Sequence, residues 1–336
     1  MNTEPGYIAL YRSGELERRV KALEARLAEC DICPRECGAK RLKGKTGACN
    51  SAYLPIVASY CAHHGEEPAL SGRGGSGTIF FANCNMRCVY CQNHQISQDP
   101  EAQQGHEIET GKLAERMLYL QDELGCHNIN LVTPSHFVPQ IVRAVFEAVP
   151  GGLRLPLVYN TSSYDSVKTL KELDGIISIY LADLRYASNE CGLKYSHVRD
   201  YADVSRAAIK EMYRQVGNLE VNDEDIAQEG LIIRHLILPN GIAGSDDSLG
   251  WLVGEVSPEV TVSIMSQYYP AHRAAGRRYP ELARKITPEE YQAVAALAEK
   301  LGIENGWMQG MDSAENYRPD FAADEPFKEE KRRSRR

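Results

Sequence analysis

Residues 77–91 read GTIFFANCNMRCVYC, and this segment decides the fold because a strand-like apolar run leads directly into three cysteines. Cys84, Cys88 and Cys91 have C-x3-C-x2-C spacing, so three thiolates can hold three corners of a four-iron cluster. Iron–sulfur clusters are normally held by four cysteines, and no fourth cysteine lies close by in the sequence. The spacing therefore predicts a cluster with one open iron that can bind a ligand.

A structural zinc site is the alternative at these three cysteines. Zinc also binds thiolates, but its closed structural sites use four ligands in a tetrahedron. His94 would complete such a set. The Gln92-Asn93 pair that follows the last cysteine, together with the strand pattern of the chain, favours the open four-iron cluster.

From residue 77 onward, apolar runs alternate with amphipathic helical stretches, which predicts a parallel βαβ series in an α/β fold. A parallel sheet of this kind forms either an open doubly wound sheet or an incomplete barrel, and the pattern alone does not separate the two. In both folds, ligands bind at the carboxyl ends of the strands, where the cysteine loop would lie. The six predicted strands are Thr78–Ala82, Asn128–Thr133, Leu155–Thr161, Ile176–Leu184, Leu231–Pro239 and Val260–Tyr268.

Helix signals and composition divide the chain into three parts. Apolar residues at helical spacing predict an amphipathic helix over 13–29, and Thr110 and Thr287 are placed to begin two later helices. We expect an N-terminal helix with a cysteine-rich metal-binding module over 1–76 and a barrel over 77–310. The tail over 311–336 is expected to be partly disordered.

The composition is that of an ordinary globular protein, with 336 residues, 43% hydrophobic and 25% charged. No apolar run approaches the roughly 20 residues needed to span a bilayer, and the start of the chain lacks the pattern of a signal peptide. We therefore expect a cytoplasmic protein with no membrane contact. A net charge of -8 argues against nucleic acid as a partner, although the chain ends in a basic run that we expect to be solvated.

A second set of cysteines precedes the first. Cys30, Cys33, Cys37 and Cys49 are four of the ten cysteines, and their spacing suits ligands better than a disulfide framework. Four thiolates repel one another unless a cation neutralises them. We favour a structural zinc ion here, with an auxiliary iron–sulfur cluster as the alternative.

The three-cysteine spacing, with Tyr90 directly before the last cysteine, resembles the signature of the radical S-adenosylmethionine (SAM) superfamily. The more detailed resemblance is to the PflX-like iron–sulfur proteins related to the activating enzymes of pyruvate formate-lyase, and it covers most of the chain. It implies a partial (β/α)6 barrel, a [4Fe-4S] cluster, and SAM that is cleaved reductively to a 5′-deoxyadenosyl radical. The segments that carry it are 30–38, 65–68, 84–93, 131–136, 159–162, 180–185, 234–239 and 265–268.

The resemblance implies roles for residues at the strand ends. Asp183 would accept a hydrogen bond from a ribose hydroxyl or from the SAM amino group, and Arg185 would pair with the SAM carboxylate. Asn160 would contact ribose or adenine, the Tyr90 main chain would meet the adenine edge, and Arg234 matches an arginine of the activating enzymes. The alternative is a structural ion pair of Asp183 with Arg185, and ordinary strand-end polar roles for Asn160 and Arg234.

Two segments depart from the superfamily pattern. After its second strand the superfamily usually has Gly-Gly-Glu, which grips the SAM amino group, whereas this chain has Thr133-Pro134-Ser135-His136. Ser135 and His136 are the natural replacements, and His136 is also a candidate catalytic acid or base. The histidine that glycyl-radical activators carry after the sixth strand is replaced here by Gln267 and Tyr268.

The expected function is therefore that of a radical SAM oxidoreductase that takes its electron from an external donor such as flavodoxin or ferredoxin. The resemblance favours a protein or peptide substrate, as for a glycyl-radical activating enzyme. One alternative is a radical SAM modifier of a small metabolite or nucleic acid. Another is a non-enzymatic electron carrier or zinc-stabilised adaptor.

Overall fold

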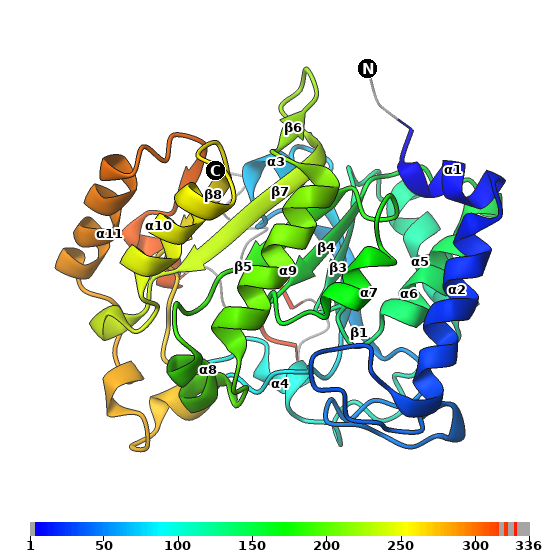
Figure 1. Cartoon of the computed structure of the whole chain (residues 1–336), viewed down its shortest axis with the longest axis horizontal. Coiled ribbons are helices and arrows are strands. Elements are labelled where there is room, and N and C mark those ends of the chain that lie inside the picture. Colours follow the sequence, from blue (N-terminus) through cyan, green and yellow to red (C-terminus); the bar gives the residue numbers. More distant parts are fainter. Residues whose placement is uncertain (1–3, 316–318, 322–325, 328–336) are drawn as a thin grey trace.

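The computed structural model describes residues 4–315, 319–321 and 326–327. In these residues a nine-stranded, mostly parallel sheet forms the centre of the molecule (Figure 1). Its strands are β1 (Val57–His63), β2 (Ser76–Phe81), β3 (Ile129–Val132), β4 (Leu157–Thr161), β5 (Ile179–Asp183), β6 (Glu220–Val221), β7 (Ala227–Leu236), β8 (Thr261–Met265) and β9 (Gly306–Met308).

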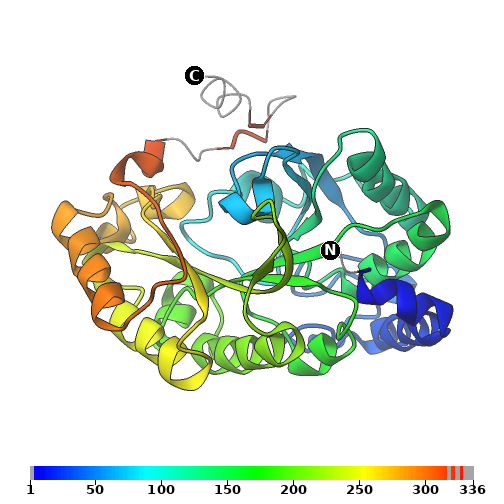
Figure 2. The same cartoon turned by 90° about the horizontal axis from the view of Figure 1, so that it is seen from above.

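The sheet has the order β1-β2-β3-β4-β5-β7-β8-β9 and curves into an incomplete barrel (Figure 2). From β2 to β9 the neighbours on this path are parallel, whereas β1 pairs antiparallel with β2. The six strands expected from the sequence are all present, so the partial-barrel fold is confirmed. Three strands were not expected: β1 and β9 extend the two edges of the barrel wall, and β6 pairs with β7 beside the main sheet.

Helices cover the outer, convex face of this sheet (Figures 1 and 2). The described α-helices are α1 (Gly6–Arg12), α2 (Glu15–Ala25), α3 (Pro68–Ser71), α4 (His94–Ser97), α5 (Thr110–Asp122), α6 (Val138–Ala148), α7 (Val167–Lys171), α8 (Asn189–Ser196), α9 (Tyr201–Val216), α10 (Ser245–Glu255) and α11 (Pro288–Lys300). The short α3 does not belong to this outer layer, because its two end residues line the cavity on the concave side. Strands β3, β4, β5 and β8 are buried along their whole length, as expected for parallel strands covered on both faces.

The predicted N-terminal helix over 13–29 is wrong in its extent. Gly14 has a left-handed backbone (φ 78°), which ends α1 and allows α2 to begin, and residues Arg26–Glu29 form a 3-10 turn rather than a last α-helical turn. The apolar stripe of α2 packs on the barrel as expected. Glu24 at its end forms a 2.5 Å ion pair with Arg143 of α6, so the N-terminal helix is fixed to the outer layer.

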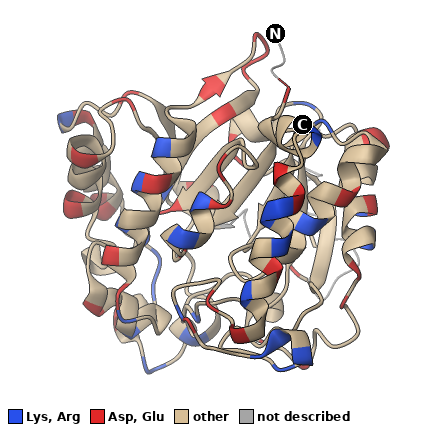
Figure 3. Cartoon of the chain, turned by 45° about the vertical axis from the view of Figure 1, so that its right-hand side comes forward, with Lys and Arg blue, Asp and Glu red and all other residues tan. Residues whose placement is uncertain are grey.

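The predicted start of α11 is confirmed. The Thr287 side chain accepts a hydrogen bond from the Glu290 backbone, and the Glu290 carboxylate accepts one from the Thr287 backbone, which is a complete capping box. Charged residues of both signs are interspersed along the outer helices (Figure 3). In the described part of the chain, no helix is long and apolar enough to cross a membrane.

Part of the 311–336 tail packs against the barrel. The Phe327 ring lies 5.2 Å from the Phe80 ring of β2 and 4.4 Å from the His63 ring of β1. Phe321 also contacts Phe80, at 5.3 Å between ring centroids. The disorder expected for the rest of this tail concerns residues 316–318, 322–325 and 328–336, which lie outside the described residues.

Candidate functional site

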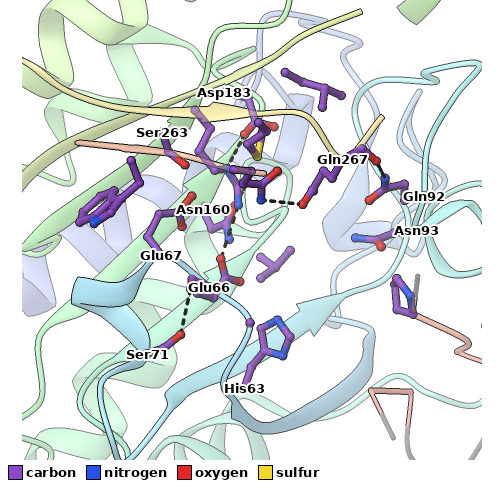
Figure 4. A pocket seen from close by; sticks show the side chains of 18 of the residues that line it. His63, Glu66, Glu67, Ser71, Gln92, Asn93, Asn160, Asp183, Ser263 and Gln267 are labelled. Carbon is purple, nitrogen blue, oxygen red and sulfur yellow. Dashed lines mark hydrogen bonds and ion pairs between the residues drawn. The ribbon is translucent and has the colours of Figure 1, made fainter. Parts of the chain in front are cut away.

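A cavity of about 740 Å³ occupies the concave side of the sheet. Its lining includes Cys91 from the cysteine loop, and polar residues from β4, β5 and β7 project into it (Figure 4). Parallel strands bring their carboxyl ends to one edge, so residues distant in the sequence meet here. Of the residues predicted as ligands of SAM or of the cluster, those that line the cavity are Tyr90, Cys91, Asn160, Asp183, Arg185 and Arg234.

The cysteine loop is held from several sides. It leaves β2 through Asn83, which has a left-handed backbone (φ 64°) and donates its backbone N–H to the Ile96 carbonyl at 2.8 Å. The Val89 backbone N–H donates to the Tyr195 carbonyl at 2.8 Å, and the Val89 carbonyl accepts a hydrogen bond from the Ala274 backbone N–H at 2.9 Å. These backbone bonds fix the loop although it has no regular secondary structure.

Cys88 lies at the centre of the three thiols. Its Sγ is 3.0 Å from the Ser196 hydroxyl and 3.6 Å from Nη1 of Arg185. Hydrogen bonds and positive charge at a sulfur stabilise its thiolate, which is the form that binds metal. The environment of Cys88 is therefore suited to a metal ligand.

Burial raises the pKa of the Cys84 thiol to about 12 and also raises the pKa of Cys91, and the nearby charge of Cys88 adds to both shifts. The three thiols are thus within electrostatic reach of one another and need a positive centre to ionise together. Each cysteine of a four-iron cluster binds a different iron, whereas the sulfur ligands of one zinc ion all lie about 2.3 Å from it. Among the described residues, no three His, Cys, Asp or Glu side chains are arranged to hold a single ion. Three converging thiols beside a cavity fit a four-iron cluster with an open corner.

A network of charged residues runs from the cysteine loop into the barrel. Asp183 accepts from Arg185 Nη2 at 2.5 Å and from Arg234 Nε at 2.8 Å, and Arg234 Nη2 donates to Asn160 Oδ1 at 2.7 Å. Burial alone would raise the pKa of Asp183, but the two guanidiniums outweigh it and hold the pKa below its ordinary value. The ion pair of Asp183 with Arg185 that we considered as an alternative is therefore present, and it lies on the cavity wall.

Ser135 and His136 do not line this cavity. The Ser135 hydroxyl lies 3.3 Å from Thr161 Oγ1, and His136 Nε2 lies 2.9 Å from the Ala82 carbonyl. Burial lowers the pKa of His136 to about 3, so its imidazole is neutral. This placement gives no support to a role of either side chain in gripping SAM or in acid–base chemistry.

The N-terminal cysteines lie beside a buried arginine. Burial raises the pKa of Cys33 to about 12, with the charges of Cys30, Cys37 and Cys49 adding to the shift, so the four thiols are mutually close. Arg41 is 1% exposed, its Nη1 donates to the His136 carbonyl at 2.6 Å, and no acceptor is found for its Nη2 in the described part of the chain. Here too, no three described side chains are arranged to hold a single ion, so the expected zinc ion finds no support in this geometry. A buried cation next to four thiols suits a metal–thiolate centre, whose net charge is negative.

Arg35 lies between Cys33 and Cys37 and connects the N-terminal module to the cysteine loop. Its Nε donates to the Asn85 carbonyl at 2.9 Å, and its Nη2 donates to the His197 carbonyl at 2.9 Å. The N-terminal module is therefore bonded directly to the loop that carries Cys84 and Cys88.

Several cavity residues were missed or left undecided in the sequence analysis. Glu66 and Glu67 belong to a segment that carried the resemblance, and the sequence left open whether they orient a substrate backbone or amine or face solvent. Ser263 of β8 and Trp307 of β9 also line the cavity, and they occupy paired positions on neighbouring strands. The only sequence signal for Ser263 was that it is a polar residue within the apolar run of β8. Nothing in the sequence of β9 indicated that Trp307 would line a cavity.

No family model matches the chain. A relative, the uncharacterised protein MJ0674 of Methanocaldococcus jannaschii, is 28% identical over 299 residues, which span 86% of this chain and 80% of the relative. Among solved structures, Streptococcus suis SuiB bound to precursor peptide SuiA aligns with a TM-score of 0.46 and 10% identity, over 72% of this chain and 51% of SuiB. TYW1 with a lysine-pyruvate adduct bound aligns with a TM-score of 0.39 and 12% identity, over 66% of this chain and 73% of TYW1. The chain thus spans about half the length of SuiB.

Proposed function

We propose that this chain is a radical SAM enzyme in which Cys84, Cys88 and Cys91 hold a [4Fe-4S] cluster. The observation that carries the proposal is that three thiols within electrostatic reach of one another lie beside a cavity of about 740 Å³, whose lining includes Cys91 and charged strand-end residues. When bound, the cluster and SAM would supply one-electron cleavage of the sulfonium to a 5′-deoxyadenosyl radical.

The residues of the cavity wall would bind and orient the nucleotide. Arg185 offers a forked donor to the SAM carboxylate, and Asp183, which stays ionised, accepts from its ammonium or ribose hydroxyl groups. Asn160 and the Tyr90 main chain would contact ribose and adenine. Arg234 positions Asp183 and Asn160 through the two hydrogen bonds described above. We keep Ser135 and His136 as weaker candidates, because neither side chain lines the cavity.

Cys30, Cys33, Cys37 and Cys49 would hold a second metal centre, for which structural zinc and an auxiliary iron–sulfur cluster are the two candidates. The electron for the first cluster would come from a cytoplasmic donor such as flavodoxin or ferredoxin. A PflX-like enzyme would act on a protein or peptide, and a small metabolite or nucleic acid is the alternative substrate.

The test is anaerobic reconstitution with iron and sulfide, followed by dithionite and SAM. We expect 5′-deoxyadenosine from the wild-type chain and none from Cys88→Ala. Cys191→Ala is the matched control, because Cys191 is a half-buried cysteine outside both sets and its replacement should leave the product yield unchanged. Full product formation by the Cys88 variant, or zinc bound by the three cysteines in protein purified without oxygen, would overturn the assignment. An adaptor or electron carrier would give no 5′-deoxyadenosine.

A further inference from the structure

Two adjacent glutamates enter the cavity from the end opposite the cysteine loop. Strand β1 runs antiparallel to β2, and its last residue, His63, pairs with Ser76 at the start of β2. The turn after β1 therefore lies where the parallel strands begin, whereas the cysteine loop follows the end of β2. Glu66 and Glu67 project from this turn into the cavity (Figure 4).

The Glu66 side chain is 9% exposed and Glu67 is buried, and the Glu67 carboxylate is incompletely satisfied. The Glu66 carboxylate lies 3.5 Å from Nη1 of Arg234, the only guanidinium with which it forms an ion pair in the described residues. Glu67 is 8% exposed, and its Oε2 has no hydrogen-bond partner in the described part of the chain. A buried carboxylate oxygen without a partner is costly for the free protein. A ligand that donates to it would remove that cost.

The charges on the cavity wall do not balance. Three carboxylates (Glu66, Glu67 and Asp183) face two guanidiniums (Arg185 and Arg234) among the described lining residues. Arg234 is already bonded to Asp183 and Asn160, which leaves it little capacity for Glu67. Burial raises the pKa of both glutamates, and the charge of Arg234 offsets this rise only in part.

The surroundings of Glu67 suit a cation on an apolar stem. Trp307 lies on the same wall as Ser263, since the two residues are paired between β8 and β9, and an indole face attracts cations. Apolar side chains, including Val132, Leu236 and Met265, line the cavity between its two ends. They can cover a chain of several methylene groups.

We propose that the Glu66–Glu67 pair is the recognition site for a cationic nitrogen, a primary ammonium or guanidinium at the end of an apolar stem, on the substrate of this enzyme. The inference rests on the proposed function, because it takes the cavity to be the reaction chamber. The cationic group binds at the glutamate end, and the remainder of the substrate extends toward the cysteine loop. A lysine-like or arginine-like side chain, or a small amine, has this chemistry.

The test compares two probes of similar size, pentylamine and pentan-1-ol, by calorimetric titration of the full-length reconstituted protein. The amine should bind and the alcohol should bind at least about tenfold more weakly, because only the ammonium makes a charge-assisted hydrogen bond. Glu67→Gln should weaken amine binding by a similar factor. Glu304→Gln, at an exposed position outside the cavity, should leave it unchanged. Equal responses to the two probes, including no response to either, or unchanged amine binding in Glu67→Gln, would overturn the proposal.

A second arm separates this site from the SAM ammonium site and from the proposed function. SAM and pentylamine should bind together, and strict competition between them would assign Glu67 to SAM and overturn the substrate site. Probe binding requires no SAM cleavage. If no 5′-deoxyadenosine forms but the amine still binds more tightly than the alcohol, the proposed function fails while the cation site stands. If 5′-deoxyadenosine forms but the amine binds no more tightly than the alcohol, the cation site fails while the proposed function stands.

Discussion

Replacing Asp183 by asparagine tests whether the charge network holds the cavity together. The substitution keeps the shape of the side chain but removes the negative charge between Arg185 and Arg234. Its carboxylate accepts at 2.5 Å and 2.8 Å from these two residues, and the Asp183 side chain is 10% exposed. Asparagine can satisfy one guanidinium, and its amide NH2 group then faces the other.

Removing one partner from a buried ion pair typically costs 3–5 kcal/mol, because it leaves a buried charge uncompensated. Since asparagine retains one acceptor, we take the lower end, about 3 kcal/mol. For a chain of 336 residues, with an unfolding entropy of about 0.7 kcal/mol/K, that loss corresponds to a fall in the unfolding midpoint of roughly 4 °C. Differential scanning calorimetry of wild-type and variant protein at pH 7 measures it.

The pH dependence provides a second check on the same reasoning. Because the pKa of Asp183 is lowered in the folded state, its contribution to stability is fully present above the unfolded pKa, about 3.9, and is lost as the pH falls through the folded value. The difference between wild type and Asp183→Asn should therefore be constant between about pH 6 and 8 and shrink below about pH 4.

Glu255→Gln is the control, because it removes the charge of an exposed ion pair with Lys210 at 2.8 Å and should leave the midpoint unchanged. A midpoint for Asp183→Asn within 1 °C of the wild-type value would refute the argument. So would a wild-type-to-variant difference that changes between pH 6 and 8.

Two further predictions concern the surroundings of Cys88 in the cysteine loop and the edge strand β9. Ser196→Ala removes the hydroxyl 3.0 Å from Cys88 Sγ. Because hydrogen bonds to sulfur stabilise the reduced form of a cluster, the reduction potential of the cluster should become more negative in a titration followed by electron paramagnetic resonance. An unchanged reduction potential would contradict Cys88 as a ligand. Gly306→Ala should lower the free energy of unfolding by about 2 kcal/mol or more, because φ is 131° and the new methyl group would overlap the Val262 carbonyl. Gly302→Ala, left-handed but with open space, should cost less in the same denaturant titration, and equal losses would show that the overlap is unimportant.

The barrel could be predicted because its central strands are continuous apolar runs of the kind that parallel sheets bury on both faces. Strand β9 could not, because Gly306–Met308 has three residues, begins with glycine and shows no alternation. Strand β1 mixes apolar and polar residues, and its pairing with β2 depends on the turn between them rather than on its own pattern. For the same reason the position of Glu66 and Glu67 was not predictable.

Within the site, the proximity of residues at strand ends follows from the sequence pattern more readily than that of residues in the loops that come after the strands. Asp183 and Arg234 lie on neighbouring strands in register, so their proximity follows from strand order. Ser135 and His136 follow Thr133, a non-glycine residue with a left-handed backbone (φ 60°). The side chains of Ser135 and His136 form their hydrogen bonds away from the cavity. A single backbone angle of this kind is set by tertiary packing and leaves no periodic signal in the sequence.

The phenylalanines near the C-terminus bear on how the protein should be prepared. Phe327 and Pro319 line the cavity, and Phe327 rests on Phe80 and His63, so the last described residues of the chain are part of its wall. Truncations that remove Phe327 would alter the cavity wall itself. Rates and affinities from such versions should be compared with those of a chain tagged at its N-terminus.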